Sequence, residues 1–420
     1  MNTFYLQNLI ADQREQFLAR ECGIPRDVDL ERHLGNRQIV VISGVRRCGK
    51  STLLRQIAER LADDFHYLNL DDERLLGFEV GDFEEAMLAF GKESDSRTIL
   101  LDEIQNVPEW ERFVRRIHDD GCKVFLTGSN AELLSSELGT RLTGRYSLVE
   151  LFPFSFAETL AFLNIDGSRR STAGRAAILK TFDSYLEHGG FPEFLRYEDR
   201  EFLARTYEDI LHRDIISRHG IREIQAFRRL AHYVNTNSTC DIRYNRVANA
   251  LEIPSPATVR DYIGYLEQSY LAFEIFKYDY SLKKQHVSSK KGYVIDNGMR
   301  NMVAFRFSSD RGKLLENAVF LALRRQGCNV YFHRDRGECD FIVVDRNRVV
   351  SAIQVCFELN DENKARELKG LAGAMRQFAL QQGLVLTYDQ SGEEELFAGA
   401  TAQVLPTWRW LLKPENSDGP

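Results

Sequence analysis

The sequence predicts an α/β fold in which a doubly wound parallel sheet comes first, a helical region follows, and a mixed α/β domain ends the chain. Short apolar runs alternate with helical stretches over residues 38–150, helical periodicity prevails over 170–285, and strand-like runs return after 288. With 420 residues the chain is also too long for one hydrophobic core. We therefore expect an N-terminal helical segment (1–37), an α/β core (38–165), a helical lid and winged-helix-like region (166–287), a C-terminal domain (288–412) and a tail (413–420).

Four apolar runs in the first part of the chain are typical of buried strands in a parallel sheet. Ligands of doubly wound sheets bind at the carboxyl ends of the strands, so we expect a site where these runs end. The four runs are residues 38–43, 65–70, 97–103 and 122–129, and helical stretches such as 50–62 and 109–121 stand between them.

The later segments carry further patterns of helices and strands. Residues 243–278 have the layout of a winged helix, with a helix, a turn at 253–256, a second helix capped by Ser255 and a pair of strands. After residue 288 we expect strands at 291–298, 329–334, 339–345, 350–357 and 383–389, and helices at 313–327 and 362–378.

The composition is that of an ordinary soluble globular protein, with 43% hydrophobic and 28% charged residues. No stretch approaches the roughly 20 apolar residues that span a bilayer, and the N-terminus lacks the features of a secretory signal, so we expect a cytoplasmic protein without a membrane partner. The net charge of −7 gives no support to a main role in coating duplex nucleic acid. The seven scattered cysteines include no C-x-x-C pair, which argues against a zinc module and a disulfide framework.

Residues 44–51 fit the phosphate-binding pattern G-x-x-x-x-G-K-[ST], with a predicted strand before them and a predicted helix after them. The glycines let successive backbone N–H groups point inward at phosphates, and the helix dipole adds to their attraction. Lys50 would contact the β- and γ-phosphates, and the hydroxyl of Ser51 would bind Mg²⁺. The sequence thus predicts an ATP–Mg²⁺ site, or P-loop, made by Gly44, Val45, Arg46, Arg47, Cys48, Gly49, Lys50, Ser51 and Thr52.

Two acids end a second strand, and polar residues end a third. We expect Asp102 to hold the magnesium, directly or through water, and Glu103 to orient and deprotonate the attacking water. Ser129 and Asn130 would contact the γ-phosphate or that water, although Gly-Ser-Asn is also a common turn.

Two arginines follow in the run RLTGR, Arg141 and Arg145. An arginine that reaches a neighbouring subunit's γ-phosphate stabilises the charge of the transition state. Surface ion pairs are the alternative for either residue, and we favour Arg145 as the finger. A finger that acts in this way would require a homo-oligomer, with which the sequence is compatible.

The runs VISGVRRCGKSTLL, LLDEIQNVPEW, FLTGSN, LTGRYSLVELFPFSF, GGFP, RDI, YVIDNG and LLENAVF together resemble prokaryotic AAA-family (AAA+) ATP-binding proteins that carry a C-terminal domain of unknown function. The resemblance extends from the QNLIADQREQF opening to about residue 390. It implies an AAA+ core, a helical lid merging into a winged-helix region, and a terminal domain with a restriction-endonuclease-like core of the PD-(D/E)XK type. Gly190 and Pro192 match a Gly-x-Pro element that packs against adenine in related signalling ATPases, and a helix C-cap at Gly189–Gly190 explains the glycines equally well.

Nucleases with that core need an acid at a strand end and an acid-x-lysine on the next strand, often with a helical glutamate. The matching positions are Glu316, Asp340, Gln354 and Cys356. Gln354 brings no charge and Cys356 does not replace a lysine cation, so we expect a degenerate domain that does not cleave.

We therefore expect a magnesium-dependent ATPase that binds ATP and ADP and acts as a nucleotide-driven switch on an unknown protein partner. The first alternative is an ATP-gated nucleic-acid-binding protein or nuclease. The second is a nucleotide-binding regulator with slow turnover. DNA is not the favoured partner, because the predicted reading helix carries Asp261 and Glu267 beside Arg260.

Overall fold

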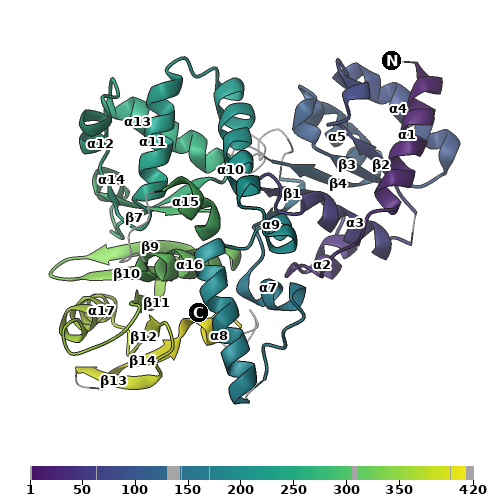
Figure 1. Ribbon diagram of the computed structural model, residues 1–420. Coiled ribbons are helices and arrows are strands. Elements are labelled where there is room, and N and C mark those ends of the chain that lie inside the picture. The colour runs from purple at the N-terminus through teal and green to yellow at the C-terminus, as the bar shows by residue number, and fades with distance from the viewer. Residues whose placement is uncertain are drawn as a thin grey trace. The chain divides into compact units, whose positions relative to one another are not determined.

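A computed structural model describes residues 2–62, 64–129, 142, 144–169, 171–304, 311–397 and 399–412 (Figure 1). The chain divides into two compact units, Met1–Phe152 and Pro153–Pro420. The boundary between these units falls inside the range 38–165 that we assigned to the α/β core. The expected tail at 413–420 lies outside the described residues.

The first unit is built on a five-stranded parallel sheet with the order β2-β3-β4-β1-β5. All four expected strands are present. The fifth, β5, escaped prediction because half of its residues are polar or exposed. Strand β4 lies between β1 and β3, so its carboxyl end separates the ends of those two strands. The strands are β1 (Ile39–Gly44), β2 (His66–Asn69), β3 (Thr98–Asp102), β4 (Lys123–Gly128) and β5 (Tyr146–Leu151).

The N-terminal helical segment is part of the first unit. Helix α1 begins after Asn2, whose side chain accepts a hydrogen bond from Phe4 N, and it buries a stripe of apolar residues in the core of this unit. Its Phe17 ring stacks on Tyr67 with the centroids 3.9 Å apart. The helices of the unit are α1 (Thr3–Leu18), α2 (Leu30–Gly35), α3 (Lys50–Arg60), α4 (Phe83–Glu93) and α5 (Trp110–Asp119), with short 3₁₀ turns η1 (Glu73–Leu75), η2 (Val80–Asp82) and η3 (Ile104–Asn106).

The second unit begins with helices, as expected, and includes a three-stranded antiparallel sheet with the order β6-β8-β7. Ser255 caps α13 by accepting a hydrogen bond from Thr258 N, which confirms that prediction. None of the helices in the described ranges is long and apolar enough to cross a membrane. The elements are α7 (Phe156–Phe162), α8 (Thr172–His188), α9 (Pro192–Tyr197), α10 (Arg200–Asp209), the π-helix η5 (Ile210–Ser217), α11 (Ile224–Thr236), β6 (Asp241–Ile242), α12 (Tyr244–Leu251), α13 (Pro256–Gln268), β7 (Ala272–Phe276), α14 (Leu282–Val287), β8 (Lys290–Val294) and α15 (Asn297–Val303).

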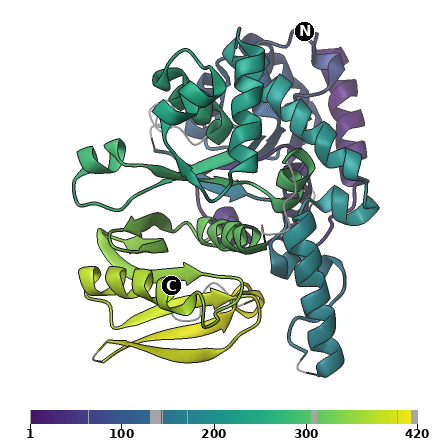
Figure 2. The ribbon, with the colours of Figure 1, turned by 60° about the vertical axis from the view of Figure 1, so that its left-hand side comes forward.

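The chain ends in a six-stranded mixed sheet with the order β13-β14-β12-β11-β10-β9 (Figure 2). Helix α17 packs on one face through Leu371 and Met375. Strand β8, which we expected in this domain, pairs instead with β6 and β7. The last two strands were not predicted. The elements are α16 (Arg311–Arg325), β9 (Asn329–Arg334), β10 (Glu338–Asp345), β11 (Arg348–Val355), α17 (Lys364–Phe378), β12 (Gln382–Thr387), β13 (Gly392–Phe397), β14 (Ala400–Pro406) and α18 (Thr407–Trp410).

Candidate active site

The predicted phosphate loop connects the end of β1 to the start of α3. Gly49, at the N-cap of α3, has φ 101°, and Arg47 also lies in the left-handed region with φ 64°. A Cβ atom on Gly44 would lie 2.0 Å from the carbonyl oxygen of Leu151, so only glycine fits there. Because Gly49 has no side chain to cap α3, the first-turn N–H groups of this helix suit an anion.

Lys50 is the best-defined cation of this loop. Its side chain is 4% exposed, and Nζ donates to the carbonyl oxygens of Gly44 and Val45, each at 3.2 Å. The same atom lies 3.9 Å from Oε1 of Glu103. The ammonium group is therefore held between the loop and the acidic end of β3, where an incoming phosphate would meet it.

The remaining loop residues split between core and surface. Val45 and Cys48 are fully buried, and Cys48 Sγ lies 3.3 Å from the carbonyl oxygen of Leu151. Burial raises the pKa of the Cys48 thiol, so the group stays protonated and packs as a small apolar side chain. In contrast, Arg47 is exposed, and the other loop side chains are half-buried: Arg46, Ser51 and Thr52.

Asp102 ends β3 as a buried carboxylate surrounded by hydroxyl groups. It accepts hydrogen bonds from Tyr67, at 3.1 Å, and from the side chains of Thr127 and Ser51. Burial, and then the negative charge of Glu103, raise the pKa of Asp102. A divalent cation would stabilise the charged form of such a group, and hydroxyl and carboxylate oxygens are the ligands that Mg²⁺ prefers. Ser51 and Asp102 thus fit the expected metal site.

Glu103 follows immediately, and its backbone adopts the left-handed conformation with φ 55°. Its side chain is one-fifth exposed, and its backbone N donates to Thr127 Oγ1 at 2.9 Å. The amide of Gln105 donates to Glu103 Oε2 and lies 3.5 Å from Ser129 Oγ, at the end of β4. We did not predict a role for Gln105, because a glutamine in a turn has no functional signature. Asn130 lies outside the described residues.

The two candidate finger arginines differ in what the structure describes. Arg141 lies outside the described residues. Arg145 directly precedes β5, and its carbonyl oxygen accepts from Ile39 N, at the start of β1. Arg145 therefore lies at the end of the sheet where the parallel strands begin. The phosphate loop lies at the other end, because it follows the end of β1. The guanidinium of Arg145 forms a 2.6 Å ion pair with Asp119. Arg145 therefore does not face the phosphate loop of its own chain.

Arg26 braces the phosphate loop, and we did not predict it. The side chain is 9% exposed, donating to the carbonyl oxygens of Cys48 at 2.9 Å and Phe152 at 2.7 Å. The same segment is held to α3 by Gln56, whose amide donates to the carbonyl of Cys22 at 2.7 Å. The residues before β1 thus form one wall of the loop.

Replacing Arg26 with alanine is expected to weaken ATP binding about tenfold and to lower the free energy of unfolding by about 1–3 kcal/mol, because two buried carbonyl groups lose their donor. Titration with a fluorescent ATP analogue and urea unfolding measure the two effects. Arg32→Ala, on the exposed face of α2, is the matched control and should leave both unchanged. Equal ATP affinity in the Arg26 and Arg32 variants would contradict the bracing role.

Gly190 and Pro192 lie at the junction of α8 and α9, and Gly190 contacts two residues that are distant in sequence. Gly190 N donates to Asp296 at 2.8 Å, and its carbonyl oxygen accepts from Phe154 N at 2.7 Å. Burial raises the pKa of Asp296 to about 6. Gly189 is the C-cap of α8 with φ 73°, and Pro192 is the first residue of α9. These contacts account for the glycines structurally, while the contact with adenine stays a prediction.

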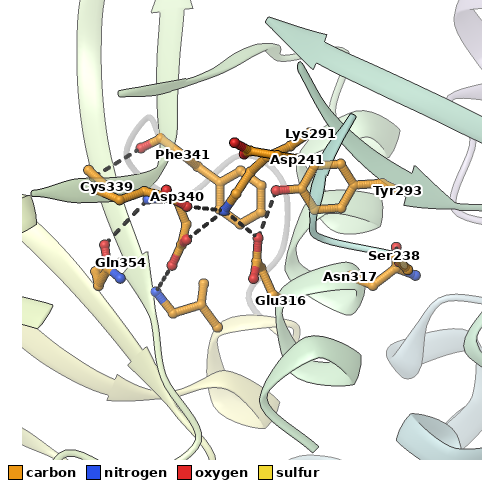
Figure 3. A network of polar contacts seen from close by, with 12 residues as sticks. Ser238, Asp241, Lys291, Tyr293, Glu316, Asn317, Cys339, Asp340, Phe341 and Gln354 are labelled. Carbon is orange, nitrogen blue, oxygen red and sulfur yellow. Dashed lines mark hydrogen bonds and ion pairs between the residues drawn. The ribbon is translucent and has the colours of Figure 1, made fainter. Parts of the chain in front are cut away.

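The nuclease-like positions gather around a lysine that the sequence did not reveal as their partner. Glu316 from α16 and Asp340 from β10 both contact Lys291, which comes from β8 (Figure 3). Gln354, on β11, accepts from Asp340 N at 3.3 Å. Cys356 follows β11, and burial raises the pKa of its thiol to about 12.

Comparisons with known proteins support an AAA-type domain in the first part of the chain. A family model described as an AAA domain matches residues 36–160, and a model described as a domain of unknown function (DUF8612) matches residues 179–310. Uncharacterized protein MJ1544 of Methanocaldococcus jannaschii is 35% identical over 409 residues, which cover 93% of this chain and 91% of that protein. This chain belongs to the same family as MJ1544, and its first part matches the AAA domain. An uncharacterized protein of Haemophilus influenzae is 30% identical over 338 residues, covering 76% of this chain and 83% of its own length.

The match to the AAA domain over residues 36–160 confirms the expected AAA-type P-loop domain. The match to the domain of unknown function lies in the second unit and includes helices and the three-stranded sheet. Solved structures that match include AMPPCP-bound DnaA from Aquifex aeolicus and the RuvB Holliday junction branch migration motor of Thermotoga maritima. They are 16% and 17% identical, cover 57% and 61% of this chain and 85% and 93% of their own, and have TM-scores of 0.26 each. Likeness at that level carries no argument about activity or partners.

Proposed function

We propose that this protein binds Mg²⁺–ATP at the phosphate loop and hydrolyses it, and that the cycle switches the contacts of its second unit with a protein partner. The observation that carries the proposal is the convergence of three side chains at one edge of the sheet. Lys50 lies 3.9 Å from Glu103, and Asp102 bonds to the hydroxyl of Ser51. Three groups therefore lie next to one another: a cation suited to phosphate, a buried acid suited to a metal ion, and a more exposed acid suited to water.

Each side chain has a distinct role in this proposal. Lys50 would exchange its carbonyl contacts for phosphate oxygens, and Ser51 with Asp102 would hold Mg²⁺, which would supply positive charge against the negative charge that develops on the phosphates. Glu103 orients the attacking water and takes its proton. Gln105 is a positioning residue, because its amide connects Glu103 to Ser129 at the end of β4.

Arg145 enters the proposal only through a second copy of the chain. Its place at the start of β5 keeps it away from its own phosphate loop, and the ion pair with Asp119 is largely exposed and weak. A ring or pair of subunits that brings this edge to a neighbour's loop would let Arg145 exchange Asp119 for a γ-phosphate. We therefore propose a homo-oligomer as the hydrolysing form.

The second unit is proposed to contain a winged helix and a restriction-endonuclease-like core that does not cleave. Helices α12 and α13 with strands β6, β7 and β8 support the first, and the parallel pair β11 and β12 joined through α17 supports the second. On α13, Arg260 is paired with Asp261 at 3.0 Å, which favours a protein contact or lid role over DNA binding. An ATP-gated nucleic-acid protein stays the alternative.

Phosphate release in the presence and absence of Mg²⁺ and of DNA tests the proposal. We expect turnover that requires Mg²⁺ and is unchanged by single- or double-stranded DNA. Stimulation of about tenfold or more by DNA would favour the nucleic-acid alternative. Tight nucleotide binding with almost no turnover, even with added partner extract, would favour the slow regulator.

A further inference from the structure

Lys291 is an ammonium group buried inside a set of carboxylates. Its side chain is 4% exposed, and Nζ lies 3.0 Å from Glu316, 2.9 Å from Asp340 and 2.6 Å from Glu338. Figure 3 shows Lys291 extending between Glu316 and Asp340, which come from different elements. Despite its burial the pKa of Lys291 is raised well above the ordinary value, because the carboxylates outweigh the cost of desolvation.

The carboxylates around Lys291 have further donors of their own. Asp340 Oδ2 accepts from Val355 N at 3.0 Å, and Glu316 Oε1 accepts from Tyr293 at 2.8 Å. Glu338 contacts Arg334, whose guanidinium also pairs with Asp241. Burial raises the pKa of Glu316 to about 7. The centre is thus a connected network of fixed donors and acceptors between β8 and β10.

The two positions that depart from the nuclease pattern are occupied by other contacts. Gln354 accepts from Asp340 N through Oε1, and its amide donates to Glu367 at 2.7 Å. Cys356 stays a buried thiol. In the described part of the chain, no group of three or more histidine, cysteine, aspartate or glutamate side chains is arranged to hold a metal ion.

We propose that Lys291 is a built-in counter-ion, which occupies the place of a divalent cation in a nuclease-like carboxylate centre and joins β8 to the terminal sheet. Mg²⁺ needs carboxylate oxygens at about 2.0–2.1 Å in an octahedron, and an ammonium bonded to the same oxygens excludes it. The inference rests on the proposed non-cleaving role of this domain and explains how the centre persists without metal. It also makes the contact permanent, since lysine, unlike a metal, does not dissociate.

Replacing Lys291 with methionine tests this assignment, because the stem is kept and only the charge is lost. The buried carboxylates then face each other unpaired, which is strongly destabilising. In the full-length protein at neutral pH, we expect amide hydrogens of β8 and β10 to exchange at least about tenfold faster than in the wild type. Millimolar MnCl₂ should restore their protection in the variant, since Glu316 and Asp340 have lost their shared cation and can pair with a hard cation instead, and it should leave the wild type unchanged.

Matched variants separate charge from packing. Lys291→Arg keeps a cation and should exchange close to wild type without a response to manganese, and Lys283→Met, at an exposed position of α14, should change nothing. If Lys291→Met fails to fold, the double variant Lys291→Met/Asp340→Asn replaces it in the test. The double variant lacks one positive and one negative charge, so it should fold, and the amide hydrogens of β8 and β10 should be partly protected from exchange.

Three results would overturn the inference. Stoichiometric Mn²⁺ binding by the wild type, measured by calorimetry with Asp340→Asn as reference, would show that the centre is a metal site although the domain does not cleave. Cleavage of DNA or RNA that requires Asp340 would overturn both the inference and the non-cleaving role. Slow exchange and no manganese response in Lys291→Met would show that the ammonium is dispensable. None of these readouts depends on ATP hydrolysis.

Discussion

Glu103→Gln protein is expected to bind ATP as tightly as the wild type and to hydrolyse it at least about a hundredfold more slowly. The amide cannot take the proton of the attacking water, whereas the change keeps the size and shape of the side chain. Nucleotide affinity should survive because Lys50 and the loop carry the phosphate contacts. Gln105 retains a hydrogen-bonding partner at position 103, so the surrounding network should stay in place.

Single-turnover phosphate release and equilibrium titration with ATP measure the two quantities separately. Glu31→Gln is the matched control, since that side chain is 82% exposed in the same unit and pairs only at the surface with Arg60. It should hydrolyse ATP at the wild-type rate. If Glu103→Gln also hydrolyses at that rate, Glu103 is not the base and another group must take the proton.

The Glu103→Gln protein is also the best reagent for identifying the partner protein. A chain that binds ATP without hydrolysing it accumulates in one conformation, and proteins that recognise this conformation stay bound. Comparing proteins captured with ATP and with ADP therefore reports on the proposed switch. A partner that binds equally in both states would argue against nucleotide control of that contact.

The phosphate site could be predicted from the sequence because its functional residues lie in short contiguous segments. The loop from Gly44 to Thr52, and the pair Asp102–Glu103, each follow an apolar strand that is recognisable on its own. Parallel strands bring their ends to one edge, so the proximity of Lys50 to Glu103 follows once the strands are identified. Strand β5 was missed because its edge position allows polar residues.

The supporting side chains could not be predicted because their partners are distant in sequence. Arg26 bonds to Phe152 across 126 positions, and Lys291 bonds to Asp340 across 49. An arginine in a loop and a lysine at a strand start have ordinary surface explanations, and only the folded chain shows that they are buried. Gln105 is close to Glu103 in sequence, but its second contact, with Ser129, depends on the order of strands.

In the C-terminal half, one strand was predicted correctly but assigned to the wrong sheet. The run 291–298 was predicted as a strand, yet pairing depends on long-range contacts, and β8 joins β6 and β7. Because β8 was assigned to the wrong sheet, Lys291 was not recognised as the cation that contacts Glu316 and Asp340. A motif search expects the lysine on the strand of Gln354, whereas Lys291 reaches Asp340 from a different sheet.

Lys50→Ala protein is expected to lose nucleotide binding, with an affinity for ATP at least about a hundredfold below that of the wild type. The side chain is the buried cation of the loop, and its removal leaves only the backbone N–H groups and Mg²⁺ to offset the phosphate charges. It also removes the positive neighbour of Glu103, 3.9 Å away, so phosphate and carboxylate would repel each other without a mediating charge.

Titration with ATP and ADP in the presence of Mg²⁺ measures the loss, and Lys92→Ala, near the end of α4, serves as the control. Far-ultraviolet circular dichroism should show that Lys50→Ala is still folded, and urea unfolding should show a loss of about 1–3 kcal/mol, because the buried carbonyl groups of Gly44 and Val45 lose their donor. The two central variants are then separable by their pattern: Lys50→Ala loses binding and hydrolysis together, whereas Glu103→Gln loses hydrolysis alone. Wild-type ATP affinity in Lys50→Ala would place the nucleotide elsewhere and remove the basis of the proposed function.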